Sequence, residues 1–546
     1  MAKAGLVGQR VRLRLESWGR LGEATAHIDG LQAFVFGGIP GEEVVAEVIQ
    51  ERRRYISARV VEVLDPSPHR VEPPCPYYGA CTGCQWQHVD YDFQLHLKRD
   101  VVVDALERVG GFHQPLVAET VPSPDQYGYR NHARFTIGNG GSLGFVNRES
   151  RQFVPIDNCM LMDPGVNRML GELQGRCGET SQLSVRYGVN TGDFLVQPTL
   201  GTTEVALPTG QKHYTESLRD RSFRVASPSF FQVNIRQLDR LVDLVREGLQ
   251  LSGSELIVDA YAGVGTFALL LMPYAGKVIA IEESPAAIED ARANASGVPE
   301  VEFVQGRTED VLGQLEEKPH GVILDPPRKG CHRSALEALD RLKPQRVVYV
   351  SCDPATLARD LKVLCRGAFF LEGVLPLDMF PQTHHVECVA TLRLRRSVES
   401  LVLASTSPRR RELVAGLGVP FEVVPPEVEE SPDGEPPEEL VRRLALAKAQ
   451  AAALQHSGRL VVGADTTVVL EGRILGKPRD EAEAVDMLRS LRGREHRVIT
   501  GVALVYGEPG ISLVEYCEST VAMRDYSDQE IEDYVAAGEA QDKAGG

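Results

Sequence analysis

The sequence contains no apolar run of about 18 residues, the length that a membrane-spanning helix requires. Its first residues, MAKAGLVGQR, lack the apolar stretch of a secretory signal, so we expect a cytoplasmic protein without membrane contacts. Positive charge is also scarce, because 59 Lys and Arg residues stand against 76 Asp and Glu residues, a net charge of −17. Binding of nucleic acid would therefore depend on local basic patches such as Arg52, Arg53 and Arg54, although a solvated strand end explains such a triplet equally well.

The chain does contain enough apolar material for several cores. The chain has 546 residues, and at roughly 150 residues per domain this length suggests about three or four domains. Its composition, 43% hydrophobic and 25% charged, is that of a globular protein. Residues 1–64 have the short alternating strands of an OB-type β-barrel. Residues 65–230 open on a loop rich in proline and cysteine and are then β-rich. Residues 231–397 alternate strands and helices, which predicts a doubly wound parallel sheet. A second α/β pattern fills residues 401–546 after a junction near 397–400, so we predict a multidomain α/β protein.

Cysteines are clustered early in the chain. Without an export signal, the ten cysteines are expected to be reduced. Cys75, Cys81 and Cys84 follow the spacing C-x5-C-x2-C, and Cys159 is a distant fourth candidate. Four thiolates suit a zinc ion or an iron–sulfur cluster. The spacing alone does not decide between these metals, and four unrelated buried thiols are an alternative.

The segment VDAYAGVGTF places Gly263 and Gly265 between an apolar strand and a helix. Such a turn lets a ligand approach the backbone at the edge of an open α/β sheet. The next strand ends in Glu282, which could hold ribose hydroxyls. Since the third glycine of a dinucleotide fingerprint is missing, the pattern favours another adenosine-containing cofactor, with a plain α/β turn as the alternative.

Two reactive side chains follow at further strand ends. Cys352 comes directly after the apolar run VVYV, and a helix begins shortly after it. We expect the helix amides to lower the pKa of this thiol and favour a thiolate nucleophile. Glu387 ends the segment DMFPQTHHVE and could act as a base. Taken alone, a cysteine after a strand is more often a small buried apolar residue.

These motifs together resemble a known family. FFQVN (230–234), VDAYAGVGTF, LDPPRKG, SCDPATLARD and DMFPQTHHVE occur in the order of the RNA (uracil-5-)-methyltransferases, over roughly residues 5–395. The resemblance implies a TRAM domain for the N-terminal barrel, a 4Fe-4S cluster on the four cysteines of a β-rich central domain, and a Rossmann-like class I methyltransferase domain. It also implies S-adenosylmethionine as cofactor, with contacts from Gln232, Tyr261, Gly263, Gly265, Glu282 and Asp325.

The same resemblance implies a reaction. Cys352 would add to C6 of uracil, C5 would take the methyl group, and Glu387 would remove the C5 proton before the cysteine leaves. Two positions depart from the common pattern: Tyr261 stands where Phe is frequent, and SCDP replaces SCNP, which puts only the tuning of the Cys352 pKa in doubt. Since the tRNA branch typically lacks the barrel and the cluster, the chain resembles the branch that methylates 23S rRNA. The tRNA branch is the alternative.

The start of the C-terminal region, LVLASTSPRRRELV (401–414), combines a strand, a serine-rich turn and arginines at a helix start. Such groups can grip a polyphosphate, although a capped helix with exposed arginines fits equally well. With GADTTV, GKPRD and HRVITGV, the region resembles the Maf family of nucleoside-triphosphate pyrophosphatases, in the branch acting on dTTP and UTP. The resemblance implies Asp465 as base, Glu430 and Asp465 as ligands of Mg²⁺ or Mn²⁺, and a nucleotide site that also includes Ser405, Ser407, Arg409, Arg410, Lys448, Thr466 and Lys477.

The Maf-like pattern is incomplete. The family continues after DKAG with a Tyr-Gly-Ile-Gln segment and a final strand and helix, whereas this chain stops at Gly546. We therefore expect a truncated domain with impaired activity. A function of another class is a nucleotide-pool pyrophosphatase whose N-terminal part only binds RNA. The intact pair of Cys352 and Glu387, set against the incomplete hydrolase, favours the RNA methyltransferase.

Overall fold

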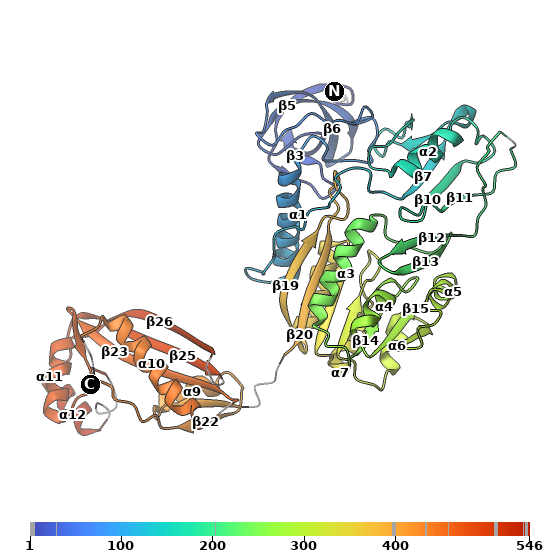
Figure 1. The fold of residues 1–546 in the computed structure, drawn as a ribbon. Coiled ribbons are helices and arrows are strands. Elements are labelled where there is room, and N and C mark those ends of the chain that lie inside the picture. The colour runs from blue at the N-terminus through green and yellow to red at the C-terminus, as the bar shows by residue number, and fades with distance from the viewer. Residues whose placement is uncertain are drawn as a thin grey trace. The chain divides into compact units, whose positions relative to one another are not determined.

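The computed structural model describes residues 6–545 apart from 29, 203, 396–399, 432–433, 457, 507–510, 539 and 541–543. The chain divides into two compact units, Met1–Arg395 and Arg396–Gly546 (Figure 1). The junction expected near 397–400 lies outside the described residues except for Ser400, and the DKAG segment at 542–545 lies partly outside them. Among the described helices, none is long and apolar enough to cross a membrane.

The larger unit begins with a six-stranded sheet in the order β1-β5-β6-β4-β3-β2. In β5 the buried residues Val44, Ala46 and Val48 alternate with more exposed ones, as in a strand with one face on a core. The region expected to hold short strands is therefore a sheet, while its identity as a TRAM domain stays a prediction. The strands are β1 (Arg10–Arg14), β2 (Ser17–Trp18), β3 (Ala24–Ile28), β4 (Leu31–Phe36), β5 (Glu43–Glu51) and β6 (Tyr55–Asp65).

A cysteine-bearing loop and a β-rich region follow. The loop leads into α1 (Tyr91–Ala105), whose N-cap is Asp90, and into the single π-helical turn η1 (Leu106–Gly110). A five-stranded sheet then has the order β11-β10-β7-β8-β9, and β12 and β13 form a separate pair. The elements are β7 (His132–Ile137), η2 (Asn139–Gly141), β8 (Leu143–Val146), β9 (Phe153–Pro155), α2 (Pro164–Leu173), β10 (Gln182–Tyr187), β11 (Phe194–Gln197), β12 (His213–Leu218) and β13 (Arg221–Ala226).

A seven-stranded sheet, ordered β16-β15-β14-β17-β18-β20-β19, forms the centre of the larger unit. Ile257 and Val258, adjacent in β14, belong to two different apolar clusters, so both faces of the sheet are covered. This explains why its parallel strands are almost wholly apolar. The elements are α3 (Ile235–Leu249), β14 (Leu256–Asp259), α4 (Thr266–Leu271), η3 (Met272–Tyr274), β15 (Lys277–Glu282), α5 (Pro285–Asn294), β16 (Val301–Gln305), α6 (Thr308–Gln314), β17 (Gly321–Leu324), α7 (Arg333–Leu342), β18 (Arg346–Ser351), α8 (Pro354–Arg366), β19 (Phe369–Leu377) and β20 (Glu387–Leu394).

The prediction of a parallel sheet is corrected at one edge. The pairs from β16 to β18 are parallel, but β20 runs antiparallel to both β18 and β19. A short loop, residues 378–386, joins β19 to β20. Only antiparallel neighbours can be joined so briefly, because a parallel pair needs a long crossover. The first residue of β20 therefore lies at the edge where the parallel strands end.

The smaller unit is built on a second sheet, ordered β22-β21-β23-β25-β26, with β24 paired to β23. Helix α10 lies very close to this sheet: a Cβ added at Gly463 or Gly501 would stand 2.3 Å from a carbonyl oxygen of the helix. The two glycines therefore allow this packing. The elements are β21 (Leu401–Ala404), α9 (Pro408–Ala415), β22 (Phe421–Val424), α10 (Pro437–Ala453), β23 (Leu460–Leu470), β24 (Arg473–Leu475), α11 (Glu481–Leu491), β25 (Glu495–Tyr506), β26 (Ile511–Ala522) and α12 (Asp528–Ala536).

Candidate active site

The parallel strands of the seven-stranded sheet end in a row of carboxyl groups. Asp259 and Glu282 are the last residues of β14 and β15, and Asp325 directly follows β17. Open α/β sheets bind ligands outside the carboxyl ends of their strands. The edge formed by these residues is therefore the candidate site.

Glu282 is engaged with the glycine turn. Its carboxylate accepts hydrogen bonds from the backbone N–H of Gly263 at 2.9 Å and of Ser284 at 2.7 Å. Gly263 has φ 55°, and no atom lies within 4 Å of the position of a Cβ there. Gly265 has φ 88°, and a Cβ there would stand 3.2 Å from Phe303. The carboxylate thus orients the turn, and the open side of Gly263 leaves room for a ligand.

Asp259 belongs to the motif VDAYAGVGTF but was not among the expected cofactor contacts. It is fully buried, one carboxylate oxygen accepts from the N–H of Ala268 at 3.0 Å, and the other has no hydrogen-bond partner. Burial raises the pKa of Asp259 to about 7, with a further contribution from Asp325, whose own pKa is raised by burial to about 7. A buried acceptor without a partner beside an open glycine turn fits a polar, cationic cofactor such as S-adenosylmethionine. The signal was present as the Asp that precedes AYAGVG.

The other two expected cofactor contacts are half-buried. Gln232 offers its backbone carbonyl to the side-chain amide of Asn131 at 3.3 Å. The Tyr261 side chain packs against the apolar cluster beneath the sheet. Burial raises the pKa of Tyr261, and the neighbouring Cys331 raises it further. Gln232 is therefore held through its backbone, and Tyr261 through the packing of its side chain.

Cys352 and Glu387 come together at the same edge. Cys352 follows Ser351, the end of β18, and Ser351 pairs with Cys388, the second residue of β20. Glu387, the first residue of β20, is 4% exposed, and its burial raises its pKa well above the usual value. Burial raises the pKa of the Cys352 thiol and the charge of Glu387 adds to this rise, so the two groups lie within electrostatic range of one another.

The expectation of a lowered Cys352 pKa is wrong for this arrangement. Burial, with help from the charge of Glu387, raises the pKa of Cys352 to about 11. Desolvation disfavours the thiolate more than the following helix favours it. Arg328, from the segment LDPPRKG, acts in the opposite direction on both Cys352 and Glu387. The sequence prediction missed Arg328, although it is the arginine of a motif placed at a strand end.

The four cysteines of the predicted cluster are half-buried free thiols. Cys75, Cys81 and Cys159 each raise the pKa of Cys84, so the four lie within electrostatic range of one another, although burial is the larger cause. Among the described residues, no group of three or more His, Cys, Asp or Glu side chains is close enough to hold a single metal ion. The arrangement is therefore a loose group of thiols.

The smaller unit assembles most of its predicted nucleotide site. Arg410 donates to the hydroxyl of Thr466 at 3.0 Å and, over a longer distance of 3.4 Å, to the hydroxyl of Ser405. The hydroxyl of Ser405 also accepts the N–H of Ser407 at 3.2 Å. Arg409 is exposed. The turn and the guanidinium group of Arg410 therefore form one polar surface.

Lys448 lies between the two predicted metal ligands. Its ammonium group is 2.6 Å from carboxylate oxygens of both Asp465 and Glu430, and Lys477 is 3.5 Å from Glu430. The Lys448 side chain is 5% exposed. A buried lysine therefore neutralises the carboxylates that the prediction assigns to catalysis and metal binding.

Comparisons with known proteins address each unit. The family model described as tRNA (Uracil-5-)-methyltransferase matches residues 211–395, and that of Maf-like protein matches residues 400–546. An uncharacterized RNA methyltransferase of Gloeobacter violaceus is 35% identical over 71% of this chain and 97% of its own length, and one of Halalkalibacterium halodurans is 34% identical over 70% and 97%. Among solved structures, the Pyrococcus abyssi tRNA (uracil-54, C5)-methyltransferase in complex with S-adenosyl-L-homocysteine is 27% identical, with a TM-score of 0.55 over 70% of this chain and all of that one.

Proposed function

The chain belongs to the family of RNA uracil-5-methyltransferases, which use S-adenosylmethionine, and we propose that its substrate is uridine C5 in 23S rRNA. The observation that carries the chemistry is that Cys352 and Glu387 lie at the same edge of the sheet: Cys352 follows Ser351, and Ser351 pairs with Cys388, the neighbour of Glu387. A thiol and a carboxyl group at one edge could supply the nucleophile and the base that C5 substitution needs.

The proposed reaction begins with covalent attack. The Cys352 thiol gives its proton to solvent, its sulfur adds to C6 of uracil, and the electron pair of the C5–C6 double bond moves toward C5 and O4. S-adenosylmethionine supplies the methyl group that C5 takes up. Glu387 then removes the proton from C5, the double bond reforms, and the bond between sulfur and C6 breaks. Splitting one difficult substitution into such steps is what a covalent nucleophile achieves.

Arg328 supports the first step. The pKa of Cys352, about 11, leaves little thiolate at neutral pH, and the positive charge of Arg328 opposes this rise. Its guanidinium group would stabilise the thiolate of Cys352 when the uracil ring enters the site and displaces water. We therefore assign Arg328 to activation of the nucleophile.

For the cysteine group we propose a 4Fe-4S cluster. A zinc ion holds four sulfurs at about 2.3 Å from one point, whereas a four-iron cluster takes one thiolate at each iron and so keeps the sulfurs further apart. Cys75, Cys81 and Cys159 all act on the pKa of Cys84, which supports a shared role for the four thiols, and the resemblance to the family favours the four-iron cluster. Cys75, Cys81, Cys84 and Cys159 would hold it.

RNA would contact two exposed features of the larger unit. We assign residues 1–64 to a TRAM domain, on which Arg52, Arg53 and Arg54 are exposed. Phe230, two residues before Gln232, is 67% exposed beside the cofactor segment. Exposed arginines bind phosphates, and exposed aromatic rings stack on unpaired bases. These features suit an RNA substrate despite the net negative charge.

Methyl transfer to purified RNA tests this proposal. The protein is incubated with S-adenosylmethionine carrying a labelled methyl group and with unmodified 23S rRNA or tRNA, and the labelled nucleoside is located. We expect 5-methyluridine in 23S rRNA. Labelling of tRNA alone would assign the chain to the other branch, and labelling of neither RNA would contradict the methyltransferase activity.

For residues 401–546 we propose binding of dTTP or UTP with little turnover. Arg410, Ser405 and Lys477 would contact phosphates, Glu430 and Asp465 would hold Mg²⁺ or Mn²⁺, and Asp465 would act as base. Lys448 already neutralises both carboxylates at 2.6 Å, so a metal ion and a free base must compete with a buried ammonium group. The competition supports impaired hydrolysis.

A further inference from the structure

The loop that carries the catalytic base is held from several sides. Residues 378–386 join β19 to β20, and Leu377 pairs with Glu387 where the two strands begin to separate. Inside the loop, Thr383 donates its hydroxyl to the carbonyl of Phe380 at 2.8 Å, and Gln382 takes a positive φ of 66°. Because Glu387 is the first residue after the loop, any displacement of the loop moves the carboxyl group of Glu387.

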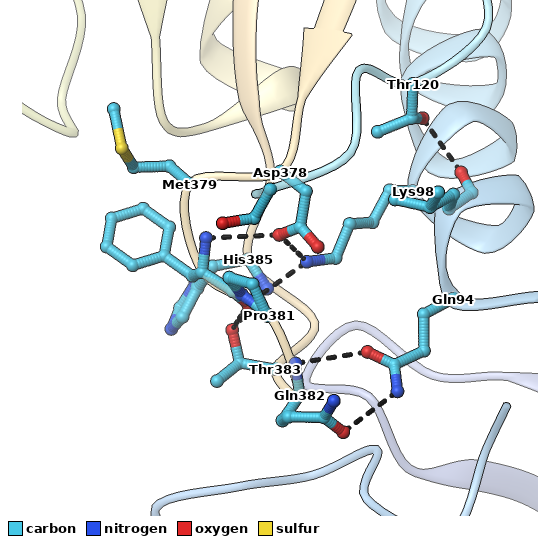
Figure 2. Close-up of polar contacts among 12 residues, drawn as sticks. Gln94, Lys98, Thr120, Asp378, Met379, Pro381, Gln382, Thr383 and His385 are labelled. Atoms are coloured by element: carbon cyan, nitrogen blue, oxygen red, sulfur yellow. Dashed lines mark hydrogen bonds and ion pairs between the residues drawn. The ribbon is translucent and has the colours of Figure 1, made fainter. Parts of the chain in front are cut away.

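Helix α1 contributes a buried ion pair to this loop. The ammonium group of Lys98 is 2.5 Å from a carboxylate oxygen of Asp378, and neither side chain has any exposed surface. Lys98 also donates to the carbonyl of Phe380 at 3.1 Å, and Asp378 accepts the N–H of Phe380 at 3.1 Å. Figure 2 shows the lysine reaching from α1 to the start of the loop. A charge this deeply buried is tolerated only with its partner in place.

A second contact from the same helix holds the middle of the loop. Gln94 is fully buried; its amide donates to the side-chain oxygen of Gln382 at 3.0 Å and its oxygen accepts the N–H of Gln382 at 3.1 Å (Figure 2). The carbonyl of Gln382 accepts the N–H groups of Gln85 and Trp86 at 3.2 and 3.1 Å. These bonds fix the strained residue of the loop through both its side chain and its backbone.

The opposite side of the loop is tied to the cofactor segment. Asn234, the N-cap of α3 in the FFQVN segment, donates to the carbonyl of Met379 at 3.3 Å. Tyr129 donates its hydroxyl to the carbonyl of Pro381 at 3.0 Å. The loop therefore lies between α1 on one side and the segment that leads to Gln232 on the other.

We propose that Lys98 and Gln94 are positioning residues that fix the loop and thereby hold Glu387 against C5 of the bound base. The inference rests on the proposed function of Glu387. Lys98 acts through the loop, since its contacts are with Asp378 and Phe380. Gln94 contacts Gln382 of the loop and also donates to the carbonyls of Trp86 and Val89 at 3.0 and 2.9 Å. Loss of either contact would slow the removal of the C5 proton while leaving the cofactor site, at the ends of β14 and β15, intact.

Two variants test the two contacts. Lys98→Met leaves Asp378 buried without its cationic partner, with the N–H of Phe380 as a remaining donor. Gln94→Met removes the contacts with Gln382, together with the bonds to the carbonyls of Trp86 and Val89, while keeping the ion pair. Glu372→Gln is the matched control for the first, because the pair of Arg346 and Glu372 belongs to the same sheet but lies at the far end of β18. Gln174→Met, which acts on the contacts of α2 with Leu143 and Ile156, is the control for the second.

The measurements are single-turnover methylation of the RNA that the wild type modifies, cofactor affinity by calorimetry, and hydrogen exchange of residues 379–386. We expect both test variants to slow turnover by roughly ten- to a hundredfold, the range for a reacting group displaced by about 1 Å. We also expect accumulation of the methylated covalent adduct, faster exchange in the loop and unchanged cofactor affinity. The control variants should turn over at the wild-type rate.

Several outcomes separate this inference from the function on which it rests. Wild-type turnover and loop exchange in a folded Lys98→Met protein would overturn the positioning role. If Lys98→Met does not fold, Gln94→Met decides in the same way. A general loss of cofactor affinity, without adduct, would overturn the inference in favour of a purely structural contact. Absence of methyl transfer by the wild type would contradict the proposed function, while loop exchange would still report on the contacts.

Discussion

At the scale of single residues, burial is the main influence on the reactive pair. It raises the pKa of both Cys352 and Glu387, and Arg328 is the charge that opposes the rise. Cys352, with a pKa of about 11, is therefore mostly a thiol at neutral pH. The reaction therefore depends on displacement of water by the uracil ring. It also depends on the positive charge of Arg328, which lowers the pKa of both groups.

Cys352→Ala should lower methylation by at least about a thousandfold, because removing a covalent nucleophile costs that much or more. Cofactor affinity should stay near the wild-type value, because the thiol would contact the base. With RNA containing 5-fluorouridine, the wild type should form an adduct stable to denaturing electrophoresis, since no C5 proton can leave. Cys365→Ala, at another half-buried cysteine, is the control. Normal methylation by Cys352→Ala would contradict the covalent mechanism.

The base can be tested through pH. Because the pKa of Glu387 is raised above its usual value, its carboxylate form persists only at higher pH than that of an ordinary glutamate, and proton removal should accelerate as pH rises. Arg328→Met should shift this rise to higher pH, since Arg328 lowers the pKa of Glu387. Glu387→Gln should abolish the rise and accumulate the methylated adduct. The rate at which the methylated adduct breaks down, measured between about pH 6 and 9, checks this step apart from the thiol, and an unchanged pH profile of that rate in Glu387→Gln would exclude Glu387 as the base.

Sequence alone predicted the strand-end residues but not the contacts that hold them. Cys352, Glu387 and the glycine turn could be read from short motifs next to apolar strands. Lys98 could not, because a lysine on a helix is expected to be exposed, and its partner Asp378 is 280 positions away. The predicted direction of the Cys352 pKa shift was wrong for a related reason, because desolvation depends on neighbours that only the fold brings together.

At the scale of elements, the segment after Cys84 is hydrogen-bonded to the loop of residues 378–386. Gln85 and Trp86 follow Cys84 directly, and their N–H groups bind the carbonyl of Gln382. The reversal of β20 belongs to the same assembly, because it turns Glu387 back toward Cys352. The sequence pattern did not predict this reversal, since an apolar strand reads the same in a parallel or an antiparallel pair.

Cys81→Ser should remove the metal and loosen the surrounding region. Anaerobically purified wild type should be brown and contain about four iron atoms per chain. The variant should lose iron and show faster hydrogen exchange over residues 65–160 than over the seven-stranded sheet. Cys177→Ser, a buried cysteine of the same β-rich region, should keep the iron. Stoichiometric zinc without iron in the wild type would contradict the cluster.

At the scale of the whole molecule, two units of different families share one chain. The larger unit carries the proposed nucleophile Cys352 and the proposed base Glu387 at one edge of its sheet, while in the smaller unit Lys448 neutralises Glu430 and Asp465. We therefore assign the main activity to the larger unit. The sequence predicted both units because each has its own motifs, but the position of Lys448 between Glu430 and Asp465 required the structure.

The full chain, incubated with UTP or dTTP and Mg²⁺ or Mn²⁺, should release pyrophosphate far more slowly than about 1 s⁻¹, the low end for ordinary enzymes. Asp465→Asn assigns any residual rate to the smaller unit, and Cys352→Ala is the control that leaves this unit intact. Turnover near 1 s⁻¹ that disappears in Asp465→Asn would contradict the impairment.

The central claim, methylation of uridine C5 in 23S rRNA through Cys352, is tested most directly in cells. Nucleoside mass spectrometry and site mapping of 23S rRNA and tRNA are compared between cells with the gene, cells without it, and cells complemented with wild type or Cys352→Ala. The account predicts that one or more 5-methyluridines of 23S rRNA disappear with the gene and return with the wild type but not with Cys352→Ala. Unchanged 5-methyluridine in 23S rRNA of the deletion strain would contradict it.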